Sequence, residues 1–397
     1  MPFDQAVKEI RQRLENSVKA QLVADVNVRS FLSGGLDSSL ITAIAQKYHN
    51  RKLKTFSIGF DDPDFDESKY ALQVSKYLKT DHHHHQFKIK DAINILPEVI
   101  KNLDEPLADA SILPTYLLSK FTKKHVTVAL SGDGGDEIFA GYPTYLAHQI
   151  SKFANLFPQS MLNMAKNIAI FSSDLIKILP ISKHAQNLSI KFKIEKAFSG
   201  LDRNQIKQYI NYIGPMLYKD KQELILEHTE TAIKHLQKLA QYKPENTSMP
   251  QYLDFMTYLS EDCLVKVDRA SSYNSLEVRP PILNANLAKM ALNLPSNYHL
   301  KNYQLKHLLK TVAQPFLPKE IIHRPKKGFG IPTHKWLRED LKNQMLDLLN
   351  EKRIKQQGLF NHHYINKLIK EHLNETQDHR MVLWNLFIFQ LWYKEWL

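Results

Sequence analysis

Two strand-like runs that lead directly into glycine-rich segments constrain the fold of this 397-residue chain more than any other feature. They are VRSFL followed by SGGLDSS (28–39) and HVTVAL followed by SGDGGDEIF (125–139). Between them, TFSIGF (55–60) has the pattern of a buried strand and SKYALQVSKYL (68–78) that of a helix. This alternation predicts an α/β fold with a mostly parallel sheet. Ligands of such sheets bind beyond the carboxyl ends of the strands, where both glycine-rich segments begin.

Strand signals fade after about residue 146, and helical periodicity replaces them. An N-terminal helix is also expected, because Val7, Ile10, Leu14 and Val18 recur every three or four residues. The later helices are expected at 146–170, 203–211, 220–241, 250–275, 303–313, 335–350 and 362–396.

The segment SGGLDSS resembles a phosphate-binding loop, but it has no lysine. Gly34 and Gly35 would let backbone N–H groups approach phosphate oxygens, and the following helix adds its positive N-terminal end. The carboxylate of Asp37 would repel phosphate, so it suggests a bridging Mg²⁺. A loop without the lysine of GxxxxGK[ST] suits pyrophosphate that leaves as a unit. Its hydroxyl donors are Ser33, Ser38 and Ser39. The alternative is a strand–helix turn with incidental serines.

The second glycine-rich segment, LSGDGGDEIFAGY (130–142), carries three acids. Asp133, Asp136 and Glu137 lie where they could complete a Mg²⁺ site shared with Asp37. One of them could also act as a general base or orient a nucleophile. The alternative is a loop whose acids cap the next helix.

The segment HRPKKGFGIP (323–332) combines glycines, prolines and cations, a composition that favours a mobile loop over a helix. A lysine from this loop could stabilise negative charge that develops on phosphate in a transition state. It would supply the positive charge that the first loop lacks. The alternative is a solvated basic turn.

A charged segment, SEDCLVKVDRASSYNSLEVRPPIL (260–283), contains six further candidate residues. The first four are at helical spacing, which predicts ion pairs of Asp262 with Lys266 and with Arg269. The segment is either a pocket for the ammonium and carboxylate of an amino acid or a buried ion-pair network. The six residues are Asp262, Lys266, Asp268, Arg269, Glu277 and Arg279.

Several function classes are disfavoured by composition. Cys263 is the single cysteine, which excludes an internal disulfide and a zinc site of several cysteines and fits a cytoplasmic location. We see no apolar run long enough to span a bilayer and expect no membrane role. The net charge of +12 is scattered over helix faces, so a nucleic-acid role is not favoured. In DHHHHQF (81–87), the histidines of a strand would alternate between faces, which disfavours a metal site at His82–His85.

Six motifs occur in the order SGGLDSS, FSIGF, DEPLADAS, LSGDGGDEIFAGY, KVDRASSYNSLEVRPPIL and RPKKGFGIP. Together they resemble the synthetase part of glutamine-dependent asparagine synthetases, a family with a PP-loop ATP pyrophosphatase fold. The resemblance covers most of the chain and is weakest over 146–250. It implies an ATP-binding core at 1–145, a helical insertion at 146–250 and a helical substrate-pocket part at 251–397.

The resemblance implies an ATP- and Mg²⁺-dependent reaction in which aspartate forms β-aspartyl-AMP and pyrophosphate, and ammonia then displaces AMP. It implies Asp37 and Asp136 as Mg²⁺ ligands and Asp133 and Lys326 as catalytic residues. Asp133 stands where glutamate is more usual. The positions that match nucleotide and pyrophosphate contacts are Leu32, Ser33, Gly34, Gly35, Asp37, Ser38, Ile58, Ser131 and Gly132.

Members of the family usually begin with a glutaminase domain, whose nucleophile is an N-terminal cysteine. Here Pro2 follows Met1 and the first loop begins at Ser33, so we expect no glutaminase domain in this chain. Ammonia would then come from solution or from a separate glutaminase subunit. Asn284 replaces an acid of the usual pattern and leaves the carboxylate substrate open. The alternatives are a ligase for a sugar acid or peptide, a PP-loop enzyme that modifies tRNA, and a non-catalytic ATP-binding subunit.

Overall fold

The computed structural model describes residues 1–154, 156–158, 160–162, 164–165, 167–168, 196–198, 200–227, 230–325, 328 and 330–397. They form two compact units. The first, called here the sheet unit, contains Met1–Pro143 and Tyr242–Ile331; the second, the helical unit, contains Thr144–Gln241 and Pro332–Leu397. The expected part 251–397 is therefore divided between the two units. Sequence periodicity marks helices but does not indicate which of them pack together.

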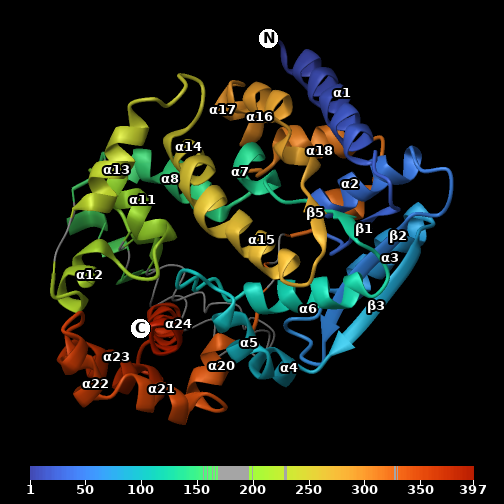
Figure 1. The fold of residues 1–397 in the computed structure, drawn as a ribbon. Helices are drawn as coiled ribbons and strands as arrows, with labels where there is room; N and C mark the ends of the chain where they lie inside the picture. The colour runs from blue at the N-terminus through green and yellow to red at the C-terminus, as the bar shows by residue number, and fades with distance from the viewer. Residues whose placement is uncertain are drawn as a thin grey trace. The chain divides into compact units, whose positions relative to one another are not determined.

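The sheet unit contains five parallel strands in the order β3-β2-β1-β4-β5, which confirms the predicted α/β class (Figure 1). Strand β1 pairs with β2 on one side and with β4 on the other. The order of the strands reverses between β1 and β4, so the switch point at which ligands bind lies between them. The bounds are β1 Val28–Phe31, β2 Lys54–Phe60, β3 Asp81–Phe87, β4 Val128–Leu130 and β5 Glu277–Arg279.

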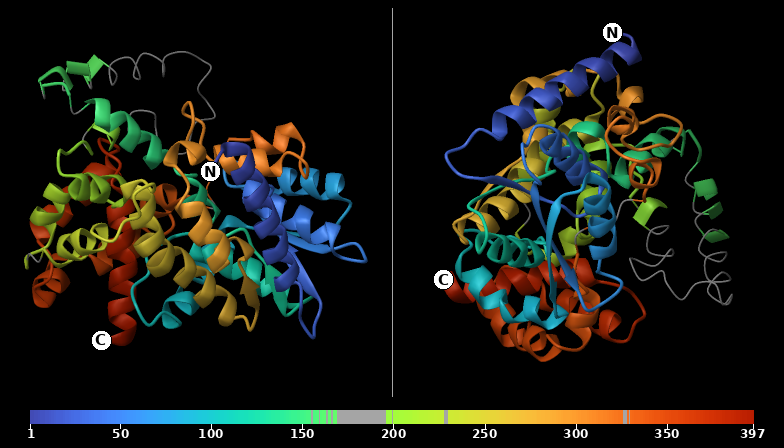
Figure 2. Two further views of the ribbon diagram at one scale, coloured as in Figure 1. Left: turned by 90° about the horizontal axis from the view of Figure 1, so that it is seen from above. Right: turned by 90° about the vertical axis from the view of Figure 1, so that its right-hand side faces the viewer.

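Helices cover both faces of this sheet. On one face, apolar side chains of α1, α2, α16 and α18 form one core with β1 and β4, and the predicted residues Val7, Ile10, Leu14 and Val18 of α1 are buried in it. On the other face, Phe31, Phe56 and Ala129 pack against side chains of α6. In the right-hand view of Figure 2, the N-terminal end of α1 points away from the blue strands.

The helices of the sheet unit that precede β5 have the following bounds: α1 Phe3–Gln21, α2 Leu36–Lys47, α3 Ser68–Leu78, α4 Ile89–Asn94, α5 Leu96–Lys101, α6 Ile112–Lys123, α7 Gly135–Phe139, α14 Met249–Leu253 and α15 Leu264–Ser272. A π-helix, η2 (Asp254–Cys263), joins α14 to α15, so the helix expected at 250–275 contains a local change of hydrogen-bonding pattern. Such π segments are rare and occur often at functional sites. After β5 come η3 Pro281–Leu283, α16 Ala285–Leu292, α17 Ser296–His299, α18 His307–Ala313 and α19 Lys319–Ile322.

In the helical unit, three of the long helices expected from periodicity are each divided into two. The segment 220–241 forms α12 and α13, 335–350 forms α20 and α21, and 362–396 forms α23 and α24. Glu375, with φ of 59°, lies in the turn between α23 and α24. None of the described helices is long and apolar enough to cross a membrane. The bounds are α8 Pro143–Ala154, α11 Gln205–Ile213, α12 Tyr218–Leu224, α13 Thr231–Ala240, α20 Thr333–Arg338, α21 Lys342–Leu348, α22 Glu351–Gln357, α23 His362–Leu373 and α24 Arg380–Trp396.

Candidate active site

The loop between β1 and α2 has the backbone geometry that its glycines predict. Gly34 has φ of 76°, a conformation that glycine adopts without strain. A Cβ atom there would lie 2.5 Å from the backbone carbon of Tyr70, so the chain passes too closely for any other residue. Gly35 then begins α2 as its N-cap residue. The loop therefore presents a helix N-terminus at the carboxyl end of β1, an arrangement that favours anion binding.

The second loop packs directly against the first because two of its glycines have no side chains. A Cβ atom at Gly132 would lie 2.7 Å from the backbone nitrogen of Ser38. A Cβ atom at Gly135 would lie 2.6 Å from the carboxyl carbon of Asp37. Both clashes would be with the first loop, so the two loops can meet only because residues 132 and 135 are glycines.

Hydroxyl groups of the first loop form a local network. The Ser33 and Ser38 hydroxyls lie 2.9 Å apart, and the Gly35 N–H donates to the Ser33 hydroxyl at 3.2 Å. Ser33 is exposed, so this network lies at the surface of the loop. The hydroxyl of Ser39 is instead fully buried, and no described residue hydrogen-bonds to it.

The remaining predicted nucleotide positions lie at the carboxyl end of the sheet. The Leu32 N–H donates to the Phe56 carbonyl, and the Ser131 N–H donates to the Arg279 carbonyl, each at 2.9 Å. Ile58 lies in β2 and is buried. These hydrogen bonds fix the backbone on either side of the two loops.

Sequence reasoning missed Lys306, which joins the two loops. Its ammonium lies 2.5 Å from Asp37 Oδ2 and 2.8 Å from Asp136 Oδ1. Burial alone would lower the pKa of Lys306, but the charges of Asp136 and Asp37 outweigh this effect and raise the pKa. Lys306 is the N-cap residue of α18 and has φ of 55°, an uncommon value for lysine. Neither its spacing nor its neighbours in the sequence point to this role.

The donor set at this point fits Mg²⁺. Asp37 and Asp136 supply carboxylate oxygens, which Mg²⁺ prefers, and a cation already lies between them. Within the described ranges, no three His, Cys, Asp or Glu side chains converge as a metal site. Mg²⁺ is commonly held by one or two carboxylates together with substrate phosphates, so two protein ligands suffice for a metal that arrives with a nucleotide.

Arg324 connects the basic segment to the first loop, and sequence reasoning missed it as well. Its guanidinium donates to the Gly34 carbonyl at 3.0 Å, forms an ion pair with Glu67 and lies 3.6 Å from the ring centre of Tyr70. The predicted catalytic residue Lys326 lies outside the described residues.

The charged segment forms ion pairs other than those its spacing predicts. Lys266 pairs with Asp109, at 2.7 Å, instead of with Asp262. Burial and then the charge of Asp109 raise the pKa of Asp262 to about 7, and Lys266 acts in the opposite direction. Burial alone would lower the pKa of Lys266, but the charge of Asp109 opposes burial and the pKa is raised. The charge of Asp133 acts in the same direction as that of Asp109, to a smaller extent. Asp262 and Lys266 are at helical spacing as predicted, but the Lys266 ammonium contacts a carboxylate from another segment.

Arg269 and Arg279 make structural contacts. Arg269 pairs with Asp104 at 2.8 Å instead of with Asp262. Arg279 pairs with Glu277 and donates to the carbonyls of Gln21 and Val23, which fixes the end of α1. These contacts agree with the ion-pair alternative for this half of the segment.

A cavity of about 220 Å³ brings three of the predicted acids together. Asp133, Asp268 and Glu277 line it, together with residues of α15 and β5. Glu137 is not among its lining residues: it is buried, accepts a hydrogen bond from Tyr142 and lies 3.7 Å from the Cys263 sulfur. Burial raises the pKa of the Cys263 thiol, as expected for a packed side chain and not for a reactive one.

Two unusual sequence features have structural explanations. In β3, His82 and His84 contact Ser57 on one face, while on the other face His83 stacks on Phe56 and His85 lies against the ring of Phe121. Asn284 is the N-cap residue of α16, and its side chain accepts from the Asn286 and Leu287 N–H groups. Asparagine is as good a cap as the acid it replaces.

A parallel sheet with a lysine-free, glycine-rich first loop and an acid-rich second loop at its switch point is an α/β fold consistent with a PP-loop domain. The asparagine synthase family matches residues 9–394, and the chain belongs to this family.

Curated relatives agree with this assignment. Asparagine synthetase 1 (glutamine-hydrolyzing) of Bacillus subtilis (strain 168) is 30% identical over 397 residues, 98% of this chain and 59% of that protein. A putative asparagine synthetase (glutamine-hydrolyzing) of Mycobacterium tuberculosis (strain ATCC 25618 / H37Rv) is 30% identical over 389 residues, 97% of this chain and 57% of that protein. This chain therefore spans less than two thirds of the length of these relatives.

Proposed function

We propose that this chain is an ATP-dependent, AMP-forming ligase that makes a carbon–nitrogen bond, with asparagine from aspartate as its reaction. The observation that carries this proposal is the meeting of the two glycine-rich loops, with Lys306 between Asp37 and Asp136. A site of this kind gathers the hydroxyls, helix N-terminus and paired acids that pyrophosphate and its metal need.

In the first step, a carboxylate oxygen of aspartate attacks the α-phosphorus of ATP. The bond from that phosphorus to the bridging oxygen breaks, and pyrophosphate leaves with its electron pair. Gly34, Gly35, Ser33 and Ser38 would hold the departing pyrophosphate through N–H and hydroxyl groups. Asp37 and Asp136 would hold Mg²⁺, which neutralises phosphate charge when it is bound. Lys326 would stabilise the charge that develops on the phosphates.

In the second step, ammonia attacks the acyl carbon of β-aspartyl-AMP, AMP leaves, and the nitrogen loses a proton. Asp133 is the acid that the family resemblance assigns to the acyl-adenylate, and it would accept this proton. Ammonia from solution or from a separate glutaminase subunit would supply the nitrogen.

The test is Mg²⁺-dependent exchange of labelled pyrophosphate into ATP, measured with aspartate, other carboxylates and tRNA. Exchange with aspartate is expected, and Asp37→Ala should abolish it while the protein stays folded. The exposed residue Asp25 provides a matched control, since Asp25→Ala should leave exchange unchanged. Asparagine formation with ammonium chloride and with glutamine then identifies the nitrogen source.

Other outcomes replace the proposal in defined ways. Exchange with a sugar acid or peptide, but not with aspartate, would identify a different carboxylate substrate. Exchange that requires tRNA would identify a tRNA-modifying enzyme. ATP binding without exchange for any acid would identify a non-catalytic subunit, and retained exchange in Asp37→Ala would remove the metal assignment.

A further inference from the structure

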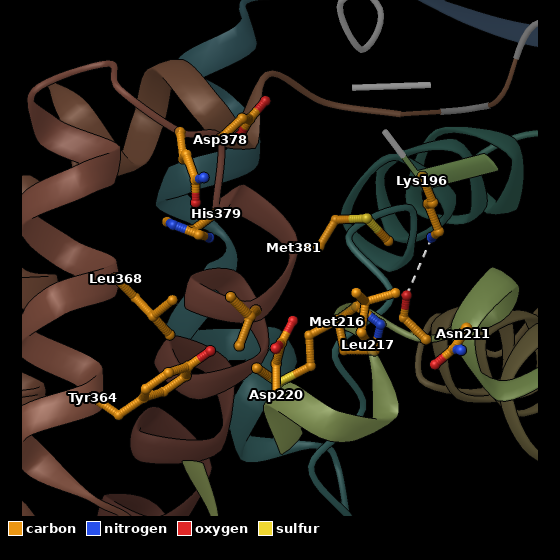
Figure 3. A pocket seen from close by; sticks show the side chains of 14 residues that line it. Lys196, Asn211, Met216, Leu217, Asp220, Tyr364, Leu368, Asp378, His379 and Met381 are labelled. Atoms are coloured by element: carbon orange, nitrogen blue, oxygen red, sulfur yellow. Dashed lines mark hydrogen bonds between the residues drawn. The ribbon is translucent and has the colours of Figure 1, made fainter. Parts of the chain in front are cut away.

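Charged side chains outside the two glycine-rich loops differ in how their contacts are arranged. The helical unit contains a cavity of about 200 Å³, in which the Lys196 ammonium donates to the Gly214 carbonyl at 3.1 Å (Figure 3). Figure 3 shows Asp220 apart from Lys196, with apolar side chains between them, so the charges of this cavity do not meet at one point. In the sheet unit, the contacts of Arg324 instead converge on one guanidinium beside the first loop.

The backbone of Arg324 is held by the helix that precedes it. Arg324 lies just after α19, and its N–H donates to the Ile321 carbonyl at 3.4 Å. Ile321 and Ile322 of this helix are buried in the core of the sheet unit. The Arg324 side chain is only 11% exposed, so it lies against the protein and not in solvent. The core therefore fixes the point from which this guanidinium reaches the first loop.

Three groups from two segments surround the guanidinium. It donates to the Gly34 carbonyl of the first loop at 3.0 Å. It also pairs with Glu67, the N-cap residue of α3, and lies 3.6 Å from the ring centre of Tyr70 in the same helix. A planar guanidinium can satisfy a carbonyl, a carboxylate and an aromatic ring at once, which an ammonium cannot do. These contacts hold the group in one orientation, and the carboxylate balances its charge.

The hydrogen bond to the Gly34 carbonyl also orients the next N–H group. A trans peptide unit is planar, so its C=O and N–H point in opposite directions. Because the Gly34 carbonyl points to Arg324, the Gly35 N–H points away from Arg324, and it donates to the Ser33 hydroxyl at 3.2 Å. A peptide unit between two glycines has few steric restrictions of its own. Its orientation therefore depends on contacts such as the one with Arg324.

We propose that Arg324 is a positioning residue that orients the first loop for pyrophosphate, an inference that rests on the proposed function. By holding the Gly34 carbonyl, Arg324 keeps the Gly35 N–H directed at the pyrophosphate before the ligand arrives. Donors that are already in place bind more tightly, because the loop does not have to become ordered on binding. Arg324 would act through the loop and not by direct attraction of phosphate, since Glu67 neutralises its charge.

The test is calorimetric titration of the whole protein with magnesium pyrophosphate and, separately, with AMP. Arg324→Met should weaken pyrophosphate binding about tenfold, as expected when one charge-assisted hydrogen bond no longer holds the loop, and should leave AMP binding unchanged. Arg324→Lys keeps the charge but not the planar guanidinium, so it should bind pyrophosphate nearly as weakly as Arg324→Met. Glu67→Gln should weaken pyrophosphate binding a few-fold, because a neutral partner holds the guanidinium less firmly.

Arg51→Met, which changes an exposed arginine of the same unit, is the matched control and should leave the binding of both ligands unchanged. The inference is overturned if Arg324→Met binds pyrophosphate like the wild type, or loses pyrophosphate and AMP equally, which would indicate a purely structural role. Full recovery in Arg324→Lys, or tighter pyrophosphate binding by Glu67→Gln, would also overturn it, because either result indicates direct attraction by charge. If the wild type binds neither ligand, the proposed function fails as well.

Discussion

The Lys306 ammonium lies 2.5 Å from the Asp37 carboxylate, although 269 residues separate the two in the sequence. The same ammonium contacts Asp136, so one buried cation holds the acids of both glycine-rich loops. A buried charge of this kind is costly to desolvate, and it is retained only with close partners. We therefore regard Lys306 as a positioning residue for the proposed metal and pyrophosphate site.

The substitution Lys306→Met should destabilise the protein, because it leaves two acids together without this cation. The expected loss is about 3–5 kcal/mol in the free energy of unfolding, the usual effect of removing one partner of a buried ion pair. Urea denaturation measures it. Lys289→Met, which changes an exposed lysine of α16, should stay within about 0.5 kcal/mol of the wild type. Equal stability of both variants would contradict the structural role of Lys306.

The substitution Lys326→Met should reduce pyrophosphate exchange by about 10²–10³-fold, since loss of one group that stabilises transition-state charge has effects of this size. The adjacent substitution Lys327→Met removes the same charge from the same segment and should reduce exchange only a few-fold. Exchange rates at saturating ATP measure both. If the two variants fall equally, the segment contributes general positive charge and not one placed lysine.

The pKa of Asp262 predicts a pH-dependent effect of Asp262→Asn. Its folded pKa of about 7 lies above the ordinary value of 3.8, so the folded protein binds this proton more tightly than the unfolded chain does. Ionisation therefore disfavours folding increasingly as pH rises from 3.8 to about 7, and the asparagine variant escapes this cost. The variant should gain stability relative to the wild type between pH 5 and pH 8, by roughly a few kcal/mol at most.

Urea denaturation at both pH values measures this difference. The neighbouring exposed residue Glu261 gives the control, because Glu261→Gln should show no such change with pH. A stability difference for Asp262→Asn that is the same at pH 5 and pH 8 would show that Asp262 titrates normally.

The substitution Asn284→Ala should lower stability by about 1 kcal/mol, the usual effect of losing an N-cap side chain. Asn284→Asp should keep the cap, and neither variant should change which carboxylate supports pyrophosphate exchange. Thermal melting and the exchange assay measure the two effects. Asn286→Ala, at an exposed position of the same helix, should have a smaller effect on melting. A changed carboxylate preference in Asn284→Asp would instead give residue 284 a role in substrate choice.

Local features of the sequence determined the elements of the sheet unit. Alternating strand and helix patterns predicted β1, β2 and α3 almost to the residue, because strand and helix periodicities depend only on near neighbours. For the glycines of SGGLDSS the sequence predicted an approach to phosphate oxygens, whereas the structure shows that Gly34 is required by the close passage of the Tyr70 backbone. In the helical unit the same patterns located helices but missed the turns that divide them.

Tertiary structure alone decided which of these elements meet. The order of the strands places β1 beside β4 and so brings the two loops together, and no local pattern specifies that order. Lys306 pairs with Asp37 and Asp136, and Lys266 with Asp109, across long stretches of sequence. Helical spacing predicted Asp262 as the partner of Lys266 because it indicates only which side chains share a face. The partner of a buried charge is instead the nearest opposite charge after packing, and packing is a property of the whole fold.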